Sequence, residues 1–67
     1  MREKILMAAR QHFTSHIEKH RMNIEIMLDN PRAIHDHTDF MTALEDEMSK
    51  MAEYKDKLEV IEDYFTA

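Results

Sequence analysis

The apolar residues in the first part of the chain recur at the spacing of an amphipathic helix. At ~100° per residue they fall within one stripe roughly 100° wide. The members of this stripe are Leu6, Ala9, Phe13, Ile17, Ile24, Met27 and Leu28. Charged and polar residues fill most of the other positions. The pattern therefore predicts a helix over about residues 3–28.

A break and a second stripe follow. The segment DNPRAIHDHTD contains Pro31, and proline disfavours helix in the residue before it. Asp36, Thr38 and Asp39 are candidate N-caps for the next helix. We expect a loop over residues 29–37 and a second helix over about residues 38–65. Its apolar stripe consists of Phe40, Leu44, Met48, Met51, Tyr54, Leu58, Ile61 and Phe65.

Two helices of similar length joined by a short loop fold back as an antiparallel hairpin, so we expect one all-α domain over residues 1–67. If the hairpin is symmetric about its loop, facing positions sum to about 67 or 68. Apolar residues then meet at four levels: Ile24 with Leu44, Ile17 with Met51, Phe13 with Tyr54, and Leu6 with Ile61. One level is polar instead. There His20, inside the first stripe, faces Glu47, near the edge of the second.

The length of the chain favours self-association. A domain of 67 residues buries too little apolar surface to be comfortably stable alone, and without cysteine it has neither disulfides nor thiolate zinc sites. Two helices also leave one side of each stripe in water. The simplest remedy is a homodimeric four-helix bundle made from two hairpins. We expect its core and oligomer interface to contain Leu6, Phe13, Ile17, His20, Ile24, Leu28, Leu44, Glu47, Met48, Met51, Tyr54, Leu58, Ile61 and Phe65.

Some apolar residues lie outside both stripes. Met22 and Ile26 fall roughly opposite the first stripe, and Val60 and Tyr64 roughly opposite the second. Isolated exposed apolar residues are normal, but these four also offer a contact surface for a partner protein. The chain contains seven methionines, whose flexible side chains suit an adaptable binding surface as well as a core.

Three histidines, His12, His16 and His20, are spaced four residues apart on the first predicted helix. His16 and His20 with Glu47 are candidate metal ligands, because histidines four apart on a helix can share one ion. However, the Glu-x-x-His motif of metal-binding bundles does not occur in the sequence. The alternative is a polar layer in which His20 and Glu47 fix the helix register. A third interpretation is a pH-sensitive site, because unperturbed histidine titrates near pH ~6.5.

The net charge is −5, and the two predicted helices differ in sign. Residues 1–28 carry five basic and three acidic side chains, whereas residues 38–67 carry nine acidic and three basic ones. This difference favours packing of one helix against the other. The acidic total argues against binding to nucleic acid, whose phosphates require clustered lysine and arginine. No stretch approaches the ~20 apolar residues that span a bilayer, so we expect no membrane partner.

The sequence contains no sign of catalytic chemistry. Without glycine it lacks phosphate-binding glycine loops, and no serine or cysteine nucleophile stands beside a placed base. We therefore expect no enzyme activity and no cofactor. The beginning MREKILMAA is charged too early for a secretory signal, which favours a cytoplasmic protein.

The run HIEKHRMNIEIMLDNPRAIHDH, followed by AEYKDKLEVIEDYF, resembles short helical proteins encoded by T4-like tailed phages, especially those of marine cyanophages. The resemblance covers most of the chain but assigns no functional residues. It implies a phage-encoded protein that is made in a bacterial host or carried in the virion. The function expected from the sequence is a small acidic interaction module that docks on and modulates another protein. The alternatives are a structural component of a phage particle and a metal-binding bundle.

Overall fold

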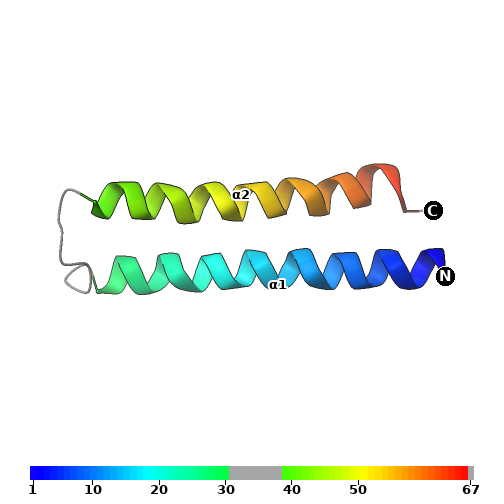
Figure 1. Cartoon of the computed structure of the whole chain (residues 1–67), viewed down its shortest axis with the longest axis horizontal. Helices are drawn as coiled ribbons and strands as arrows, with labels where there is room; N and C mark the ends of the chain where they lie inside the picture. Colours follow the sequence, from blue (N-terminus) through cyan, green and yellow to red (C-terminus); the bar gives the residue numbers. More distant parts are fainter. Residues whose placement is uncertain (31–38, 67) are drawn as a thin grey trace.

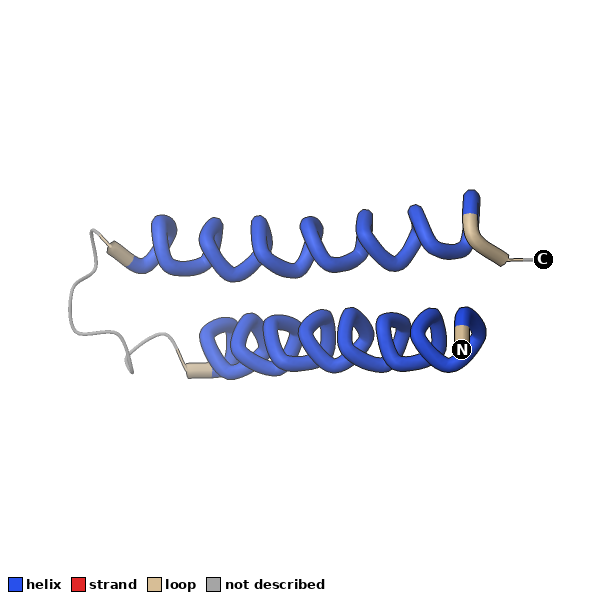
Figure 2. The backbone as a smooth tube through the Cα atoms, turned by 45° about the vertical axis from the view of Figure 1, so that its right-hand side comes forward, coloured by secondary structure: helices blue, strands red, loops and turns tan. Residues whose placement is uncertain are grey.

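The computed structural model describes residues 1–30 and 39–66, which form two long helices (Figure 1). Helix α1 spans Arg2–Asp29 and helix α2 spans Phe40–Tyr64. The helices lie side by side and antiparallel, so both ends of the chain are at the same end of the molecule (Figure 2). The predicted all-α hairpin is confirmed. No helix in the described ranges is long and apolar enough to cross a membrane.

The ends of the helices follow from local chemistry. Helix α1 continues one residue beyond its predicted end, and the amide of Asn30 donates a last hydrogen bond to the carbonyl of Ile26 over 2.9 Å. Pro31 follows at once, and a residue before proline is disfavoured in the helical region. Helix α2 closes in the same way, because the amide of Phe65 donates to the carbonyl of Ile61.

The start of α2 differs from the sequence-based expectation. Asp39 occupies the N-cap position, but its backbone is already helical and its side chain makes no capping hydrogen bond. A side-chain cap needs an extended backbone at that residue, which explains the difference. The other candidate caps, Asp36 and Thr38, lie outside the described residues together with His35, His37 and most of the predicted loop.

The core between the helices is thin. Among residues 1–30 and 39–66, three side chains are buried: His20, Ile24 and Ile61. The other inward-facing residues of the two stripes keep part of their surface in water; they are Leu6, Ala9, Phe13, Ile17, Met27, Phe40, Leu44, Glu47, Met51, Tyr54 and Leu58. Two cylinders touch along a line and cannot enclose side chains on all sides. The hairpin therefore has a contact stripe rather than a full core.

Three residues expected in the core or interface are exposed within the single chain. Leu28 retains 58% and Met48 49% of its accessible surface, and Phe65 is also exposed. Leu28 and Met48 lie at the edges of their stripes, where they line one exposed groove between the two helices. Phe65 follows the last residue of α2, where the helical backbone has ended. These three side chains are not covered within one hairpin, so their place in an oligomer interface stays a prediction.

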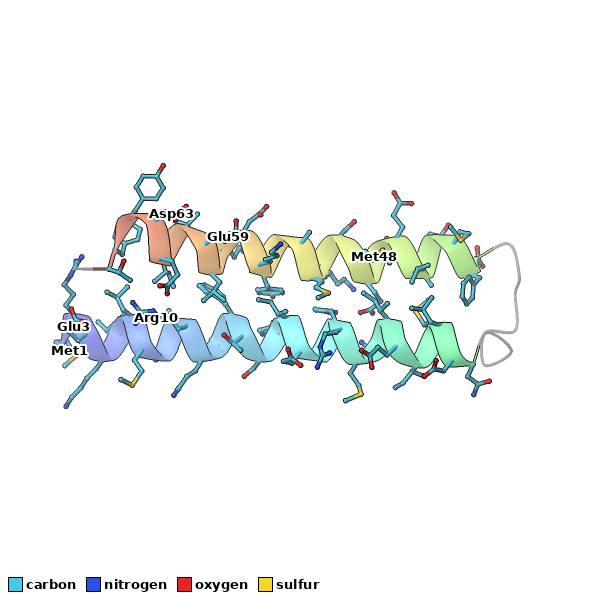
Figure 3. All side chains as sticks on the ribbon, turned by 180° about the vertical axis from the view of Figure 1, so that it is seen from behind. Met1, Glu3, Arg10, Met48, Glu59 and Asp63 are labelled. Carbon is cyan, nitrogen blue, oxygen red and sulfur yellow. The ribbon has the colours of Figure 1, made fainter. Side chains whose placement is uncertain are left out.

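One ion pair joins the helices near the chain ends. Arg10 Nε donates to Glu62 Oε1 over 2.8 Å, and Arg10 is labelled on α1 in Figure 3. Both side chains are well solvated, and an exposed ion pair contributes only about 0–1 kcal/mol to stability. Its contribution is mainly to orient the basic helix against the acidic one.

Candidate functional site

A polar layer crosses the middle of the hairpin. His20 Nδ1 lies 2.7 Å from Glu47 Oε2, as the predicted register requires. His20 is 4% exposed, and the carboxylate of Glu47 is also largely covered. An ionised carboxylate only accepts hydrogen bonds, so the proton of this bond belongs to His20 Nδ1. The most deeply buried side chain of the hairpin is therefore polar and has its partner on the other helix.

Asn23 completes this layer and was missed by the sequence analysis. Its Nδ2 donates to the same Glu47 oxygen over 3.2 Å, so Glu47 accepts two hydrogen bonds from α1. Asparagine has a low helix propensity, and Asn23 stands in the middle of α1, three residues after His20. The sequence signal for this role was a residue with low helix propensity, Asn23, about one turn from the predicted contact of His20 with Glu47.

The two hydrogen bonds stabilise the charged form of Glu47. They lower the pKa of its carboxyl group, the bond from His20 more than that from Asn23, against an opposing effect of desolvation. The charges of His20 and Lys50 add smaller effects in the same direction. Glu47 is therefore ionised at neutral pH and holds two polar side chains of α1.

This pKa shift predicts how stability depends on pH. Because the pKa of Glu47 is lower in the folded chain, its contribution is complete above the unfolded value, about 4.3. It is lost as the pH falls below that value and through the folded pKa. We expect the melting temperature of the natural chain to fall more steeply below pH ~5 than that of Glu47→Gln. Thermal circular dichroism of both proteins over a range of pH checks this. The two proteins share all other carboxyl groups, so the difference between their curves reports on Glu47. Parallel curves would contradict it.

The ring of Tyr54 contacts two members of the histidine row, which we define as His12, His16 and His20. Its ring stacks on His16 with 4.3 Å between centroids and 11° between planes, and lies 6.0 Å from His20. Phe13 contacts the same ring, as predicted, at 6.2 Å. The Nζ of Lys57 lies over Tyr54, 5.0 Å from its centroid, as in a cation–π contact. Tyr54 therefore limits how far the ring of His16 can turn.

The pKa of His16 is lowered from its ordinary value. Desolvation is the main cause, followed by the positive charges of His12, Lys19, His20 and Lys57. Below neutrality His16 thus stays unprotonated to a lower pH than an isolated histidine. Of these neighbours, Lys57 also donates a hydrogen bond to Glu53 over 2.8 Å, and His20 is bonded to Glu47.

The three candidate metal ligands His16, His20 and Glu47 do not form one site. His20 and Glu47 bond directly to each other, and the ring of His16 rests on Tyr54. In the described parts of the chain, no group of three or more histidine, aspartate or glutamate side chains is placed to hold a metal ion. The polar-layer interpretation of His20 and Glu47 agrees with the observed contact.

An exposed apolar face lies on the other edge of the stripes, toward the loop end of the hairpin. Two adjoining grooves share Met48 and Ala52; Figure 3 labels Met48 on α2. We call the apolar lining of both grooves the Met48 face; it consists of Ile24, Leu28, Met41, Leu44, Met48, Met51 and Ala52. Arg21, Glu25, Glu45 and Lys55 stand at its rim. An apolar centre with a charged rim is the usual anatomy of a protein interface.

The four residues expected to form a partner surface are all exposed. Met22 and Ile26 are on α1, and Val60 and Tyr64 are on α2. By helical spacing they point away from the contact between the helices. They are thus separate from the Met48 face.

No family model matches the chain, and neither a curated protein nor a solved structure is significantly similar to it. The fold and the site define an all-α helical hairpin with one buried polar layer and one exposed apolar face.

Proposed function

We propose that this protein is a small, non-enzymatic interaction module that self-associates through the Met48 face into a homodimeric four-helix bundle. The observation that carries the proposal is the exposure of Leu28, Met41 and Met48 on one continuous apolar surface beside the core residue Ile24. Leu28 and Met48 belong to the helical stripes and Met41 adjoins the second one, yet the single chain leaves all three in water.

The accessible surface of the single hairpin supports a second copy as the occupant of this face. The chain exposes 5422 Å². A compact monomer of 8.1 kDa would expose about 4500 Å². The excess, about 900 Å², is close to the ~800 Å² that each partner buries in a standard interface. The hairpin measures 47 Å by 15 Å, so one side is large enough for such a contact.

The rim of the Met48 face suits a twofold contact between identical chains. It carries both signs of charge, Arg21 and Lys55 beside Glu25 and Glu45. In a twofold interface the same patch meets its own copy, so a rim of mixed sign is self-complementary. A uniformly charged rim would repel a second copy.

The dimer leaves a second surface for another protein. Met22 and Ile26 on one helix, and Val60 and Tyr64 on the other, stay outside the Met48 face and offer apolar contacts among charged neighbours. The resemblance to short helical proteins of T4-like phages suggests a phage-encoded accessory factor in the cytoplasm of a bacterial host. It would dock on a host or phage protein and modulate it. A structural part of the phage particle is the alternative; detection of the chain in purified virions would favour it.

Paired charge substitutions test the dimer. A lysine placed in an apolar interface loses its hydration without gaining a partner. We expect Met48→Lys to convert the dimer to a helical monomer or a partly unfolded chain, with native mass read by analytical ultracentrifugation. Met22→Lys is the matched control, another exposed methionine in the middle of a helix, and should stay dimeric. If Met22→Lys dissociates the assembly and Met48→Lys does not, the interface lies on the opposite face and the proposal fails.

A further inference from the structure

We propose that His12 and His16 form a two-histidine chelating site for a divalent transition-metal ion of the Zn²⁺, Ni²⁺ and Cu²⁺ series. This site differs in its ligands from the set His16, His20 and Glu47, which the structure does not assemble. It lies on the edge of α1 opposite Leu28, away from the Met48 face. It is therefore independent of the proposed dimer.

The geometry of the two rings carries the inference. His12 and His16 are one helical turn apart, and their ring centroids are separated by 4.6 Å with 72° between the ring planes. The lone pair of an imidazole nitrogen lies in the plane of its ring, so two strongly inclined rings can direct lone pairs to one point. With metal–nitrogen bonds of about 2.1 Å, two imidazoles that share an ion have centroids roughly 4.5–5.5 Å apart. The observed separation falls within this range.

The neighbouring pair does not meet the same conditions. His16 and His20 have the same sequence spacing, but their centroids are 6.4 Å apart and their planes differ by 22°. Lone pairs in nearly parallel, separated planes do not converge. His20 is also buried and uses Nδ1 for Glu47. The two pairs have the same sequence spacing, but the ring separations and orientations favour His12 and His16 as the chelating pair.

Neighbouring aromatic rings restrict the orientation of His12 and His16. Tyr54 stacks on His16, and Phe13 meets the edge of His12 with 5.6 Å between centroids, so both rings have restricted rotation. The side-chain hydrogen bonds described in this region join His20, Asn23 and Glu47, and none of them uses His12 or His16. Water completes the coordination sphere. Lys19 and Lys57 repel a bound cation, but both are solvent-exposed and therefore screened.

The type of ligand follows from donor chemistry. Neutral imidazole binds zinc, nickel and copper well, whereas magnesium and calcium prefer oxygen donors. Divalent affinities for nitrogen sites rise toward copper, so Cu²⁺ should bind most tightly and Mg²⁺ not measurably. Chelation by two side chains of one folded helix should also stabilise the helix, because the unfolded chain does not hold the rings together.

Isothermal titration calorimetry of the purified protein at pH 7.5, with CuCl₂ and with ZnCl₂ separately, tests the proposal. All measurements use a His35→Ala/His37→Ala background, which removes the two histidines that lie outside the described residues. We expect one ion per chain, an affinity at least tenfold weaker in His12→Ala or His16→Ala, and no change in Gln11→Ala. We also expect Zn²⁺ to raise the melting temperature of the background protein but not of either histidine variant.

A spacing variant provides the sharpest control. His12→Ala combined with Gln11→His keeps the number of histidines but separates them by five residues instead of four, which puts them on different sides of the helix. It should bind as weakly as His12→Ala alone, with an unchanged helical circular dichroism spectrum. If it binds metal like the background protein, or if His12→Ala leaves the affinity unchanged, His12 and His16 are not a chelating pair.

Discussion

Replacement of Ile24 by alanine should lower the free energy of unfolding by about 2–5 kcal/mol, the usual range for isoleucine truncated in a core. Ile24 is 8% exposed and is one of two buried apolar side chains among the described residues. Domains of this size lose ~4–8 °C of melting temperature per kcal/mol, so the drop should be roughly 8 °C or more. Thermal and urea unfolding followed by circular dichroism, at a fixed protein concentration, measure the change.

The same helix offers a matched control for this prediction. Ile26 is 53% exposed, so Ile26→Ala removes the same atoms from a surface position and should change stability by less than about 0.5 kcal/mol. Ile61→Ala and Val60→Ala repeat the comparison on α2, where Ile61 is buried and Val60 exposed. Equal effects of Ile24→Ala and Ile26→Ala would contradict the arrangement of the two helices described above.

The polar layer predicts opposite results for single and double substitutions. Glu47→Leu removes the acceptor shared by His20 and Asn23 and leaves the His20 imidazole buried without a partner. Such an orphaned group costs about 1–3 kcal/mol. In His20→Leu/Glu47→Leu both polar partners become apolar, so stability should return to the natural level or exceed it. Melting curves of the natural chain, both single variants and the double variant form a thermodynamic cycle.

The double leucine variant should keep its stability but lose specificity for one oligomeric state. A buried polar position fixes register and oligomer state because a shifted arrangement leaves it unpaired. The double leucine variant lacks this restriction, so its native mass should spread over several oligomers instead of one. A double variant that is markedly less stable and forms one clean oligomer would show that the His20–Glu47 contact stabilises the fold without setting its register.

Much of this arrangement follows from periodicity alone. The stripes predicted both helices and their antiparallel pairing, and the hairpin register placed His20 opposite Glu47 and Phe13 beside Tyr54. These features depend on backbone geometry, which repeats with the spacing of residues. The sequence is therefore informative about which levels of the two helices meet.

Side-chain orientation was harder to foresee. Periodicity assigned Leu28 and Met48 to the core or oligomer interface without separating the two. A two-helix contact is narrower than an apolar stripe about 100° wide, so in one hairpin the edges of the stripe stay in water. The role of Asn23 depends on a hydrogen bond across the helices, and that of Tyr54 on ring stacking. Neither is encoded in spacing. The difference between the His12–His16 and His16–His20 pairs likewise lies in ring planes, which the sequence does not contain.

The exposed apolar edges link the fold to the proposed function. The Met48 face runs along part of a body 47 Å long and is exposed in the single hairpin. In the proposed dimer, a second copy would supply an apolar surface of equal length and matching rim. The proposed self-association would therefore explain both the thin core of one chain and the placement of Met41, Met48 and Met51.

The native mass of the purified protein, by light scattering over a range of concentrations with and without a metal chelator, tests this account most directly. We predict a mass of twice 8.1 kDa that the chelator does not change, because the dimer is held by the Met48 face and not by the histidines. Dissociation should appear only at high dilution, together with a loss of helicity. A stable helical monomer at all concentrations, or an assembly that the chelator dissolves, would contradict it.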